Sequence, residues 1–423
     1  MSRFAFFSEL VSSFLLMPLA WVCAGVWRRF AVHRRPIVFQ GWLGSETVGD
    51  VAILGQVLRE WSLIFPKRRQ IVVSFRPEIS RRSLEELNCQ DVSVVAAGLL
   101  GSWYQLVSEV LVFSGGPLME SKAMPLWAWR AGLARLAGSK VVVHGCGIGP
   151  VRSRWVRKSI HTLLGSCREI ILRDAESLQE VPPGLRPWVS FDPAFDYVRR
   201  WRSQSEQRLS SSQRRVALFL RYPPRSYLDL GVQEWKSACE QFVSLLAATL
   251  DELGEEMDLE WIGLVMHGDF LESNDHELYQ AVKGQMGFPD RLKVRSGHHD
   301  LPYVLEELEA SRAALTVRFH GMIFSLARGK PLVAIDYTVP RGKVSAAAKE
   351  CGALHRVVPW QDLNSKTLPE RLKAAIQEGE SQPQTAALLG DPESLRLARC
   401  AHLRGSVPGQ EEGGGASNDR PTS

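Results

Sequence analysis

The stretch TVRFHGMIFSLARGKPLVAIDY, residues 316–337, decides the fold of this chain. An apolar strand ends at Arg318, a helix of about two turns follows, and Arg-Gly-Lys-Pro at 328–331 ends that helix before a second apolar strand. Ligands of parallel sheets bind at the carboxyl ends of the strands, which is where Arg318 and His320 are expected. An Arg there suits a carboxylate or phosphate, and a His beside it can move a proton near neutral pH. The alternative is a buried Arg and His that satisfy strand-end carbonyl groups.

The same alternation extends outward from this stretch. Apolar runs of strand length occur at 37–39, 70–74, 92–96, 110–113, 140–144, 169–172, 216–220, 259–265, 292–295, 313–317, 332–335 and 355–358. Helical periodicity lies between them, as at 48–64, 125–137, 154–164, 235–253, 275–284, 301–311 and 342–351. The pattern predicts an α/β protein of two doubly wound, Rossmann-like domains that face a ligand cleft. We expect domains at 37–198 and 215–400, a polar linker at 199–214 and a disordered tail at 401–423.

Composition is that of an ordinary globular protein, with 45% hydrophobic and 23% charged residues among 423 and a formal net charge of +5. The basic clusters contain no nucleic-acid motif, so a nucleic-acid partner is not expected. The seven Cys are scattered and form no CxxC pair, which favours a reducing compartment and argues against a structural zinc site.

The N-terminal segment 1–36 differs from the rest. Residues 10–27 carry no charge, and Arg28, Arg29, Arg34 and Arg35 follow them. A secretory signal has its positive charge before the apolar run, so a membrane-associated helix is the better interpretation. By the positive-inside rule the body of the protein would then be cytoplasmic. Whether the helix spans the bilayer, lies on it or docks on the protein core stays open.

Glycine turns mark the first predicted domain. The turn at 41–54 contains Gly49 and Asp50 at the start of a helix, and the strand at 110–113 runs into Gly115 and Gly116. Glycines let a ligand approach the backbone, although each turn alone is a weak signal. Arg173 stands at another strand end.

The second domain has polar residues at the ends of its strands. Arg221 follows its first strand, His267 its second, and Lys343 comes shortly after the strand 332–335. Together with Arg318 and His320 they make five polar residues at the ends of strands of one sheet. Arg221, Arg318 and Lys343 could all reach one anionic ligand.

In this order, the segments resemble the polysaccharide pyruvyl transferase family. The resemblance covers roughly residues 37–357 and is carried by Gly49-Asp50, Ser114-Gly115-Gly116, Gly145-x-Gly147-Ile148-Gly149-Pro150, Arg173-Asp174-x-x-Ser177, Asp192-Pro193-Ala194-Phe195, Arg318-x-His320, and Gly329-x-Pro331 with Tyr337 and Lys343. It implies a two-domain fold like that of GT-B glycosyltransferases. It also implies transfer of the enolpyruvyl unit of phosphoenolpyruvate to two hydroxyls of a sugar, leaving a cyclic ketal and releasing phosphate.

The resemblance implies roles for single residues. His320 would transfer the proton, Arg173, Arg221, Arg318 and Lys343 would clamp the anionic donor, and Asp50 would orient or deprotonate the acceptor. We also count His267, Gly49, Gly115 and Gly116 as substrate-binding. No cofactor or metal is expected. The expected partners are phosphoenolpyruvate, a sugar or lipid-linked saccharide, and the cytoplasmic face of the inner membrane; a homo-oligomer is left open.

Two departures from the family pattern keep other functions in view. Val51 stands where the family commonly has Glu, and Pro117 cuts short a glycine run. One alternative is a GT-B-like glycosyltransferase that uses a nucleotide sugar, although the C-terminal half has no clear acidic ribose-binding pattern. The other is a non-catalytic, membrane-associated component of polysaccharide assembly.

Overall fold

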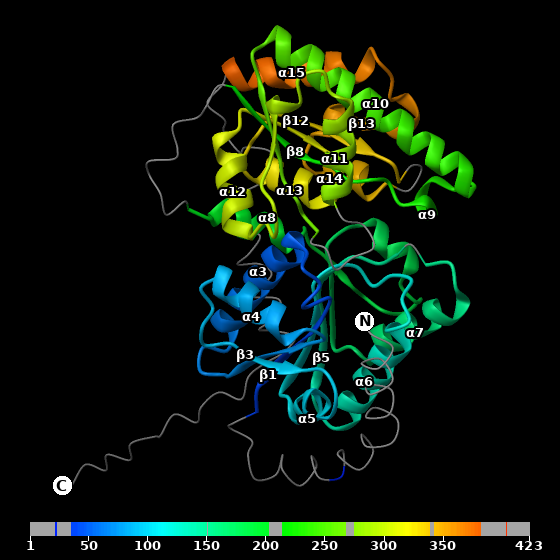
Figure 1. The fold of residues 1–423 in the computed structure, drawn as a ribbon. Helices are drawn as coiled ribbons and strands as arrows, with labels where there is room; N and C mark the ends of the chain where they lie inside the picture. Colours follow the sequence, from blue (N-terminus) through cyan, green and yellow to red (C-terminus); the bar gives the residue numbers. More distant parts are fainter. Residues whose placement is uncertain are drawn as a thin grey trace, which may run out of the picture.

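The computed structural model describes residues 35–149, 151–202, 214–267, 275–338 and 342–381, together with Val22 and Leu403. The chain forms two lobes, one above the other in Figure 1. Each lobe is built on one parallel sheet with helices packed against it. We call the first sheet and its helices the N-lobe and the second sheet and its helices the C-lobe.

The N-lobe sheet has seven strands in the order β3-β2-β1-β4-β5-β6-β7, and every pairing is parallel. The strands are β1 Ile37–Gly41, β2 Gln70–Ser74, β3 Ser93–Ala96, β4 Val110–Ser114, β5 Lys140–Cys146, β6 Glu169–Leu172 and β7 Trp188–Val189. The helices are α3 Val48–Ile64, α4 Pro77–Glu86, α5 Leu99–Val107, α6 Met124–Leu136, α7 Arg154–Ser166, the 3-10 helix η3 Glu176–Glu180 and α8 Pro193–Arg200. Strand β7 was not predicted, because two residues are too short to make an apolar run.

The C-lobe sheet has six parallel strands in the order β10-β9-β8-β11-β12-β13. The strands are β8 Arg215–Phe219, β9 Glu260–Gly263, β10 Leu292–Val294, β11 Ala313–Thr316, β12 Leu332–Asp336 and β13 Val357–Pro359. The α-helices are α9 Arg225–Leu228, α10 Val232–Glu256, α11 Asp275–Gln285, α12 Leu301–Ala310, α13 Phe319–Ala327, α14 Lys343–Glu350 and α15 Thr367–Ser381. Three 3-10 helices complete it: η5 Pro289–Arg291, η6 Leu354–Arg356 and η7 Trp360–Asp362.

Burial explains why the strands read as continuous apolar runs. All five residues of β1 are buried, since helices cover both faces of the sheet. The side chains of successive residues pack in different hydrophobic clusters: Val38 belongs to one cluster, and Ile37 and Phe39 belong to another. This period of two is that of a strand, so both faces of each lobe acquire an apolar layer.

One hydrophobic cluster continues from the N-lobe into the C-lobe. It contains Phe39 of β1 and Phe195 of α8, and it extends to Phe219 of β8, Val304 of α12 and Phe324 of α13. Helix α8 ends the N-lobe part of the chain, yet Figure 1 places it beside the C-lobe helices. The lobes are therefore joined by packed apolar side chains as well as by the chain itself.

The predicted fold class is confirmed: two doubly wound parallel sheets face each other. The domain boundaries stay predictions, because residues 203–213 of the expected linker are outside the described ranges. Of the expected apolar helix in residues 1–36, only Val22, Arg35 and Pro36 are described. Within the described ranges, no helix combines the length and the apolar character needed to cross a bilayer. Leu403, the one described residue of the expected tail, is buried in the cluster shared by the lobes, and the disorder expected at 401–423 stays a prediction.

Candidate functional site

Each sheet reverses its strand order at one place. In the N-lobe this lies between β1 and β4, and in the C-lobe between β8 and β11. Such switch points are where doubly wound sheets bind ligands, outside the carboxyl ends of the strands. The predicted residues follow these strands: Gly49 and Asp50 after β1, Gly115 after β4, Arg221 after β8 and Arg318 after β11.

Backbone contacts join the two switch points. The Val48 N–H at the start of α3 donates to the Met266 carbonyl oxygen, which lies 3.1 Å away. Thr47 and His267 form an isolated antiparallel bridge. The chain segment that follows β9 therefore lies against the N-terminus of α3, which brings His267 next to Thr47.

His320, on the first turn of α13, lies against Gly49. A Cβ atom on Gly49 would be 1.9 Å from His320 Nδ1, so no residue with a side chain fits there without moving the imidazole. Phe319 and Phe324 are ring neighbours of His320, at centroid distances of 5.2 and 6.3 Å. The contact explains why the first turn of α3 carries a glycine, and it places an imidazole from one lobe on the backbone of the other.

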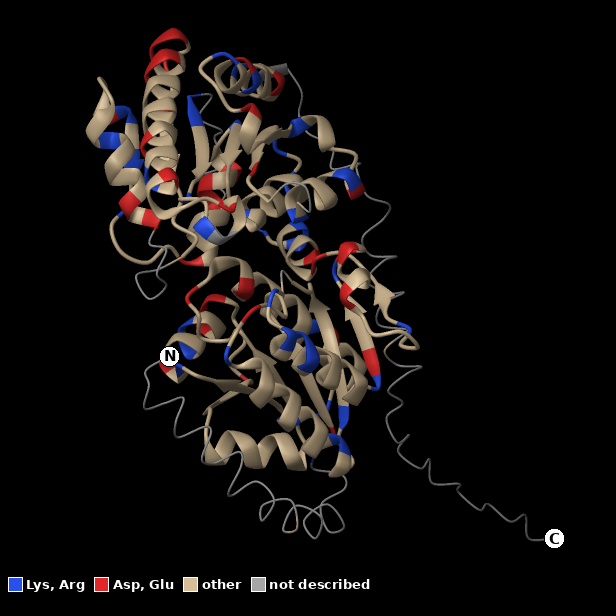
Figure 2. Ribbon diagram, turned by 90° about the vertical axis from the view of Figure 1, so that its right-hand side faces the viewer, with Lys and Arg blue, Asp and Glu red and all other residues tan. Residues whose placement is uncertain are grey.

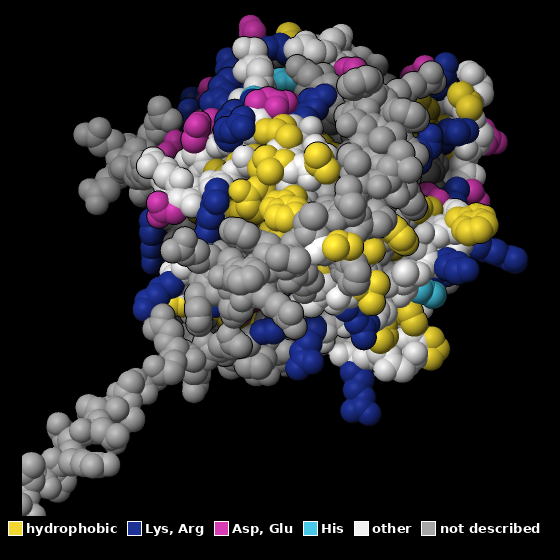
Figure 3. Space-filling view, turned by 90° about the horizontal axis from the view of Figure 1, so that it is seen from below, with side chains coloured by type: hydrophobic (Ala, Val, Ile, Leu, Met, Phe, Trp, Pro, Cys, Tyr) yellow, Lys and Arg dark blue, Asp and Glu magenta, His cyan; other side chains and the backbone are white. Residues whose placement is uncertain are grey.

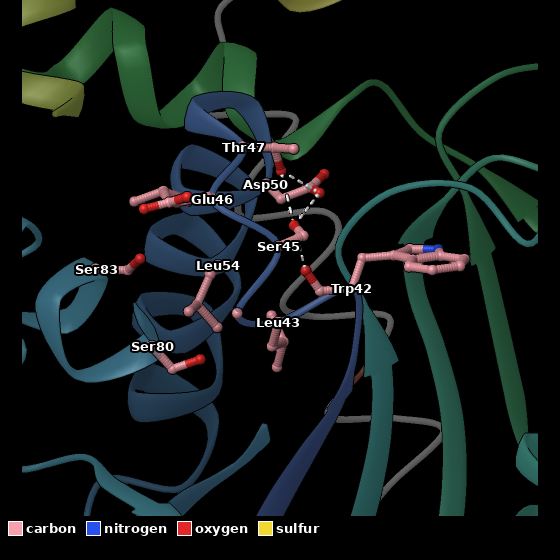
Figure 4. A pocket seen from close by; sticks show the side chains of 11 residues that line it. Trp42, Leu43, Ser45, Glu46, Thr47, Asp50, Leu54, Ser80 and Ser83 are labelled. Atoms are coloured by element: carbon pink, nitrogen blue, oxygen red, sulfur yellow. Dashed lines mark hydrogen bonds between the residues drawn. The ribbon is translucent and has the colours of Figure 1, made fainter. Parts of the chain in front are cut away.

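Asp50 is held by two hydroxyl groups of its own turn. Thr47 donates to Asp50 Oδ2, and Ser45 donates to the same oxygen at 3.2 Å. Figure 4 shows these three side chains together at the start of α3. Burial raises the pKa of Asp50, and the opposing charge of His320 and the Thr47 hydrogen bond do not cancel this rise. A carboxyl with a raised pKa is suited to accept and return a proton near neutral pH.

Gly115 and Gly116 form the turn beside this carboxylate, and Gly116 leaves room for it. Their φ angles are +78° and +67°, values that favour glycine. A Cβ atom on Gly116 would be 3.3 Å from Asp50 Oδ1 and 2.8 Å from the Trp42 ring. The Trp42 indole donates to the Pro117 carbonyl oxygen at 2.7 Å, so Pro117 takes part in fixing this loop.

A small, shallow hollow lies beside the first turn of α3. Its lining carries several hydroxyl and carboxylate groups: Ser45, Glu46, Thr47, Asp50, Ser80 and Ser83. Figure 4 shows that Ser80 and Ser83 come from α4, across α3 from Asp50. Val51, one of the two departures from the family pattern, also lines the hollow.

Arg173 and Asp192 form a buried ion pair in the N-lobe. Arg173 Nη1 lies 2.9 Å from Asp192 Oδ2, and both side chains are at most 3% exposed. Arg173 Nε is buried without a hydrogen-bond partner, and the guanidinium lies 4.8 Å from the centre of the Phe319 ring. Asp192 Oδ2 is also 3.7 Å from His320 Nε2. The sequence analysis treated Asp192 as part of a family motif but gave it no role in the site.

Arg318 is paired with Asp275, a site residue that the sequence analysis missed. Arg318 Nη2 donates to Asp275 Oδ1, while its buried Nε and Nη1 have no hydrogen-bond partner. Asp275 Oδ2 accepts the N–H groups of Met266 and His267, at 3.0 and 3.2 Å. The carboxylate therefore fixes one edge of the guanidinium and leaves the other edge for an anion.

Arg221 and Lys343 complete the cationic group. Neither has a carboxylate partner within the part of the chain that the structure describes. Lys343 Nζ lies 5.8 Å from the centre of the Phe319 ring. Burial, together with the charges of Arg173 and Arg221, lowers the pKa of Lys343 to about 8. Phe319, which sequence reasoning also missed, thus contacts a cation from each lobe.

The surroundings of His267 and Cys146 determine the protonation states of their side chains. Burial and the charge of Arg318 lower the pKa of His267 well below its usual range, so this imidazole is neutral at neutral pH. Burial raises the pKa of Cys146 to about 12, which leaves no thiolate nucleophile there. The site therefore holds a neutral His267, His320 next to carboxylates, and four cations contributed by both lobes. Figure 2 shows charged residues of both signs where the lobes meet.

The sequence model of the polysaccharide pyruvyl transferases matches residues 48–338. This is more than half of the chain. The chain belongs to the polysaccharide pyruvyl transferase family. The matched segment includes every residue predicted for the site except Lys343, which follows it. No curated protein matches the chain.

Solved structures similar to this member of the pyruvyl transferase family share its two-lobed fold. They include UDP-GlcNAc 2-epimerase from Methanocaldococcus jannaschii, with 12% identity, a TM-score of 0.56, and coverage of 88% of this chain and 99% of that one. Sucrose-phosphate synthase from Thermosynechococcus elongatus has 11% identity, a TM-score of 0.52, and the same coverage of both chains. At such identities the likeness concerns the fold alone, which is of the GT-B-like type.

Proposed function

We propose that this protein is a ketal pyruvyl transferase that uses phosphoenolpyruvate. The observation that carries the proposal is the convergence of Arg173, Arg221, Arg318 and Lys343 around the Phe319–His320 turn. Phosphoenolpyruvate has a carboxylate and a phosphate, and several fixed cations in a desolvated cleft suit such a polyanion. Burial and, after it, the charges of Arg173 and Arg221 lower the pKa of Lys343 to about 8, and a bound anion would relieve the part of this shift that comes from repulsion among the cations.

The chemistry needs one acid and one base. His320 donates a proton to the methylene carbon of phosphoenolpyruvate while a sugar hydroxyl adds to the neighbouring carbon and gives its proton to Asp50. The carbon–oxygen bond to phosphate then breaks, with Asp50 returning its proton to the leaving phosphate. A second hydroxyl closes the ketal ring and its proton restores His320. Two hydroxyl protons are lost and two are delivered, so neither residue is changed by the cycle.

The acceptor enters from the N-lobe side in this proposal. Ser45, Glu46 and Asp50 are half-buried in the lining of the hollow, and their side-chain oxygens suit the hydroxyl groups of a sugar. We infer that the acceptor is a sugar of a bacterial-type exopolysaccharide or cell-surface polysaccharide repeat unit. Trp127 is 1% exposed and packs in the core, so it offers no face to a sugar ring.

We further propose that the enzyme works at the cytoplasmic face of the inner membrane on a lipid-linked saccharide. Figure 3 shows hydrophobic side chains among Lys and Arg on the underside of the N-lobe. Helices α5, α6 and α7 have large apolar side chains that are exposed: Leu99, Leu100, Trp129, Leu136 and Trp155. Exposed Trp and Leu beside basic groups suit the interface of an anionic membrane.

The test is to incubate purified protein with phosphoenolpyruvate and extracted lipid-linked saccharide and to follow phosphate release. Phosphoenolpyruvate at about 100 times its dissociation constant should raise the free energy of unfolding by roughly 2.7 kcal/mol. The same unfolding measurement with a UDP-sugar tests the alternative, a GT-B-like glycosyltransferase that uses a nucleotide sugar. Stabilisation by the UDP-sugar and none by phosphoenolpyruvate would exclude the proposal. Binding of neither, with no phosphate release, would favour a non-catalytic assembly component.

A further inference from the structure

One carboxylate oxygen connects the lobes at the centre of the site. Asp192 Oδ2 lies 2.9 Å from Arg173 Nη1 in its own lobe and 3.7 Å from His320 Nε2 in the other. The Asp192 side chain is 2% exposed, so water screens these contacts little. His320 Nε2 is buried and has no hydrogen-bond partner at present.

The backbone fixes the direction of this carboxylate. Asp192 is the N-cap of α8, and its Oδ1 accepts the Ala194 N–H at 2.9 Å. Oδ1 is thereby occupied, and Oδ2 is turned toward Arg173 and His320. A capping residue needs one oxygen only, so capping does not account for a second oxygen shared between a guanidinium and an imidazole.

The electrostatics favour an ionised Asp192. Burial alone would raise its pKa, but the Arg173 charge and the interaction with His320 outweigh burial and hold the pKa below its usual range. Asp50 and His267 also interact with the charge of His320, and the Arg173 guanidinium, bound to the same Asp192 oxygen, adds a positive charge nearby. Asp50 is the proposed base and His267 is neutral, which leaves Asp192 as the lasting negative charge beside the imidazole.

We infer that Asp192 is a positioning residue for His320: it aligns the imidazole through Nε2 and stabilises its protonated form. The inference rests on the proposed function for the role of that proton. A contact of 3.7 Å is longer than a hydrogen bond, and contacts of this kind often shorten when substrate binds. Asp192 would thus activate the C-lobe acid from the N-lobe.

The experiment compares Asp192→Asn with wild type. Asn keeps an oxygen for the α8 cap and removes the charge. We expect turnover at saturating phosphoenolpyruvate to fall by about 10- to 100-fold, a part of the 10²- to 10⁴-fold that proton transfer contributes. In a His320→Gln background, the same substitution should have no further effect on turnover, because the group that Asp192 assists is gone.

A second readout does not depend on activity. The ¹⁵N shifts of the His320 ring, assigned with His320→Gln, report the imidazolium fraction at a fixed pH, and this fraction should decrease in Asp192→Asn. Asp300→Asn is the control, since Asp300 caps α12 through the Tyr303 N–H at 2.8 Å and should leave both readouts unchanged. Unaltered His320 shifts together with unaltered turnover in folded Asp192→Asn would overturn the inference. If wild type transfers no pyruvyl group, the proposed function fails, and the ring shifts still decide whether Asp192 acts on His320.

Discussion

The two halves of the site differ in the charge that they contribute. The C-lobe supplies Arg221, Arg318, Lys343 and two imidazoles, whereas the N-lobe supplies glycines, hydroxyl groups and the carboxylates of Asp50 and Asp192. In the proposed reaction, the anionic donor would therefore have most of its partners in the C-lobe, and the neutral sugar would have its partners in the N-lobe. Arg173 is the N-lobe exception: its guanidinium lies 4.8 Å from the centre of the Phe319 ring of the C-lobe.

The pKa shifts follow the same division. In the C-lobe, burial and crowding lower the pKa of Lys343 and of His267, so positive charge is disfavoured there before an anion arrives. In the N-lobe, burial raises the pKa of Asp50, whereas the Arg173 charge and the interaction with His320 outweigh burial and lower the pKa of Asp192. Each half therefore holds a group whose charged form is disfavoured by burial, Lys343 in the C-lobe and Asp50 in the N-lobe, as is common where acid–base chemistry takes place.

The largest effect should come from the residue at which the halves meet. We expect His320→Ala to lower turnover by about 10²- to 10⁴-fold while phosphoenolpyruvate still binds, because only the movable proton is lost. Arg318→Ala should abolish donor binding as well, since it removes a fixed fork of hydrogen-bond donors. Phosphate release and calorimetric binding separate the two variants. Full turnover in His320→Ala would remove this residue from the mechanism.

A second prediction tests the contact between the lobes by adding one methyl group. Gly49→Ala places a Cβ atom 1.9 Å from His320 Nδ1, so either the imidazole or the lobe must move. We expect turnover to fall by about 10²-fold, the size of effect that a displacement of about 1 Å produces. Gly165→Ala on α7 is the matched control, because nothing lies within 4 Å of its added methyl group. Equal turnover of the two variants would show that the contact between His320 and the Gly49 backbone is not required for activity.

A third prediction uses pH to test the cationic half. The Lys343 ammonium loses its charge as pH rises through about 8, and the donor anion binds the charged form. Affinity for phosphoenolpyruvate should therefore be full below this pH and decrease above it, by no more than about tenfold per pH unit. Lys343→Arg keeps its charge throughout and should remove this decrease. A wild-type affinity that stays constant from pH 7 to about pH 9 would exclude Lys343 from the clamp.

The smallest effect on the chemistry is expected from the N-terminal segment, which would serve only to deliver a lipid-linked acceptor to the N-lobe. Arg35 bonds to the Val107 carbonyl oxygen and should be kept, so the deletion is residues 1–34. The shortened protein should fold, leave the membrane fraction and still bind phosphoenolpyruvate. The basic residues 28, 29 and 34 contribute of order 1 kcal/mol each to membrane attraction. Aggregation of the shortened protein, with a full chain that is soluble without detergent, would instead make the segment part of the core.

Much of the fold could be predicted from the sequence, because strands covered on both faces are continuous apolar runs that local pattern reveals. The helix at Val48–Ile64 was predicted with the bounds that the structure gives. Arg318 and His320 could be placed at the ligand edge from their position after a strand. Local pattern thus finds the elements and the polar residues at the ends of strands.

The residues that sequence reasoning missed act through tertiary contacts. Asp275 is the first residue of α11 in sequence and has no local sign that it pairs with Arg318, which is 43 positions away. Phe319 was overlooked because its neighbours in sequence, Arg318 and His320, carry the evident acid–base and anion-binding groups. The reason for Gly49 is a histidine in the other lobe, which no pattern near residue 49 could indicate.

The hydrophobic cluster that continues through α3, α8, α12 and α13 has a consequence for how the enzyme loses its structure. Two lobes that met only through polar surfaces would melt as separate calorimetric units. Here the apolar side chains of one lobe are covered in part by those of the other, so unfolding either lobe exposes surface on its neighbour. Heating should therefore give one cooperative unfolding transition. The contacts of His320 in the C-lobe and of Asp50 and Asp192 in the N-lobe would then be disrupted at the same temperature.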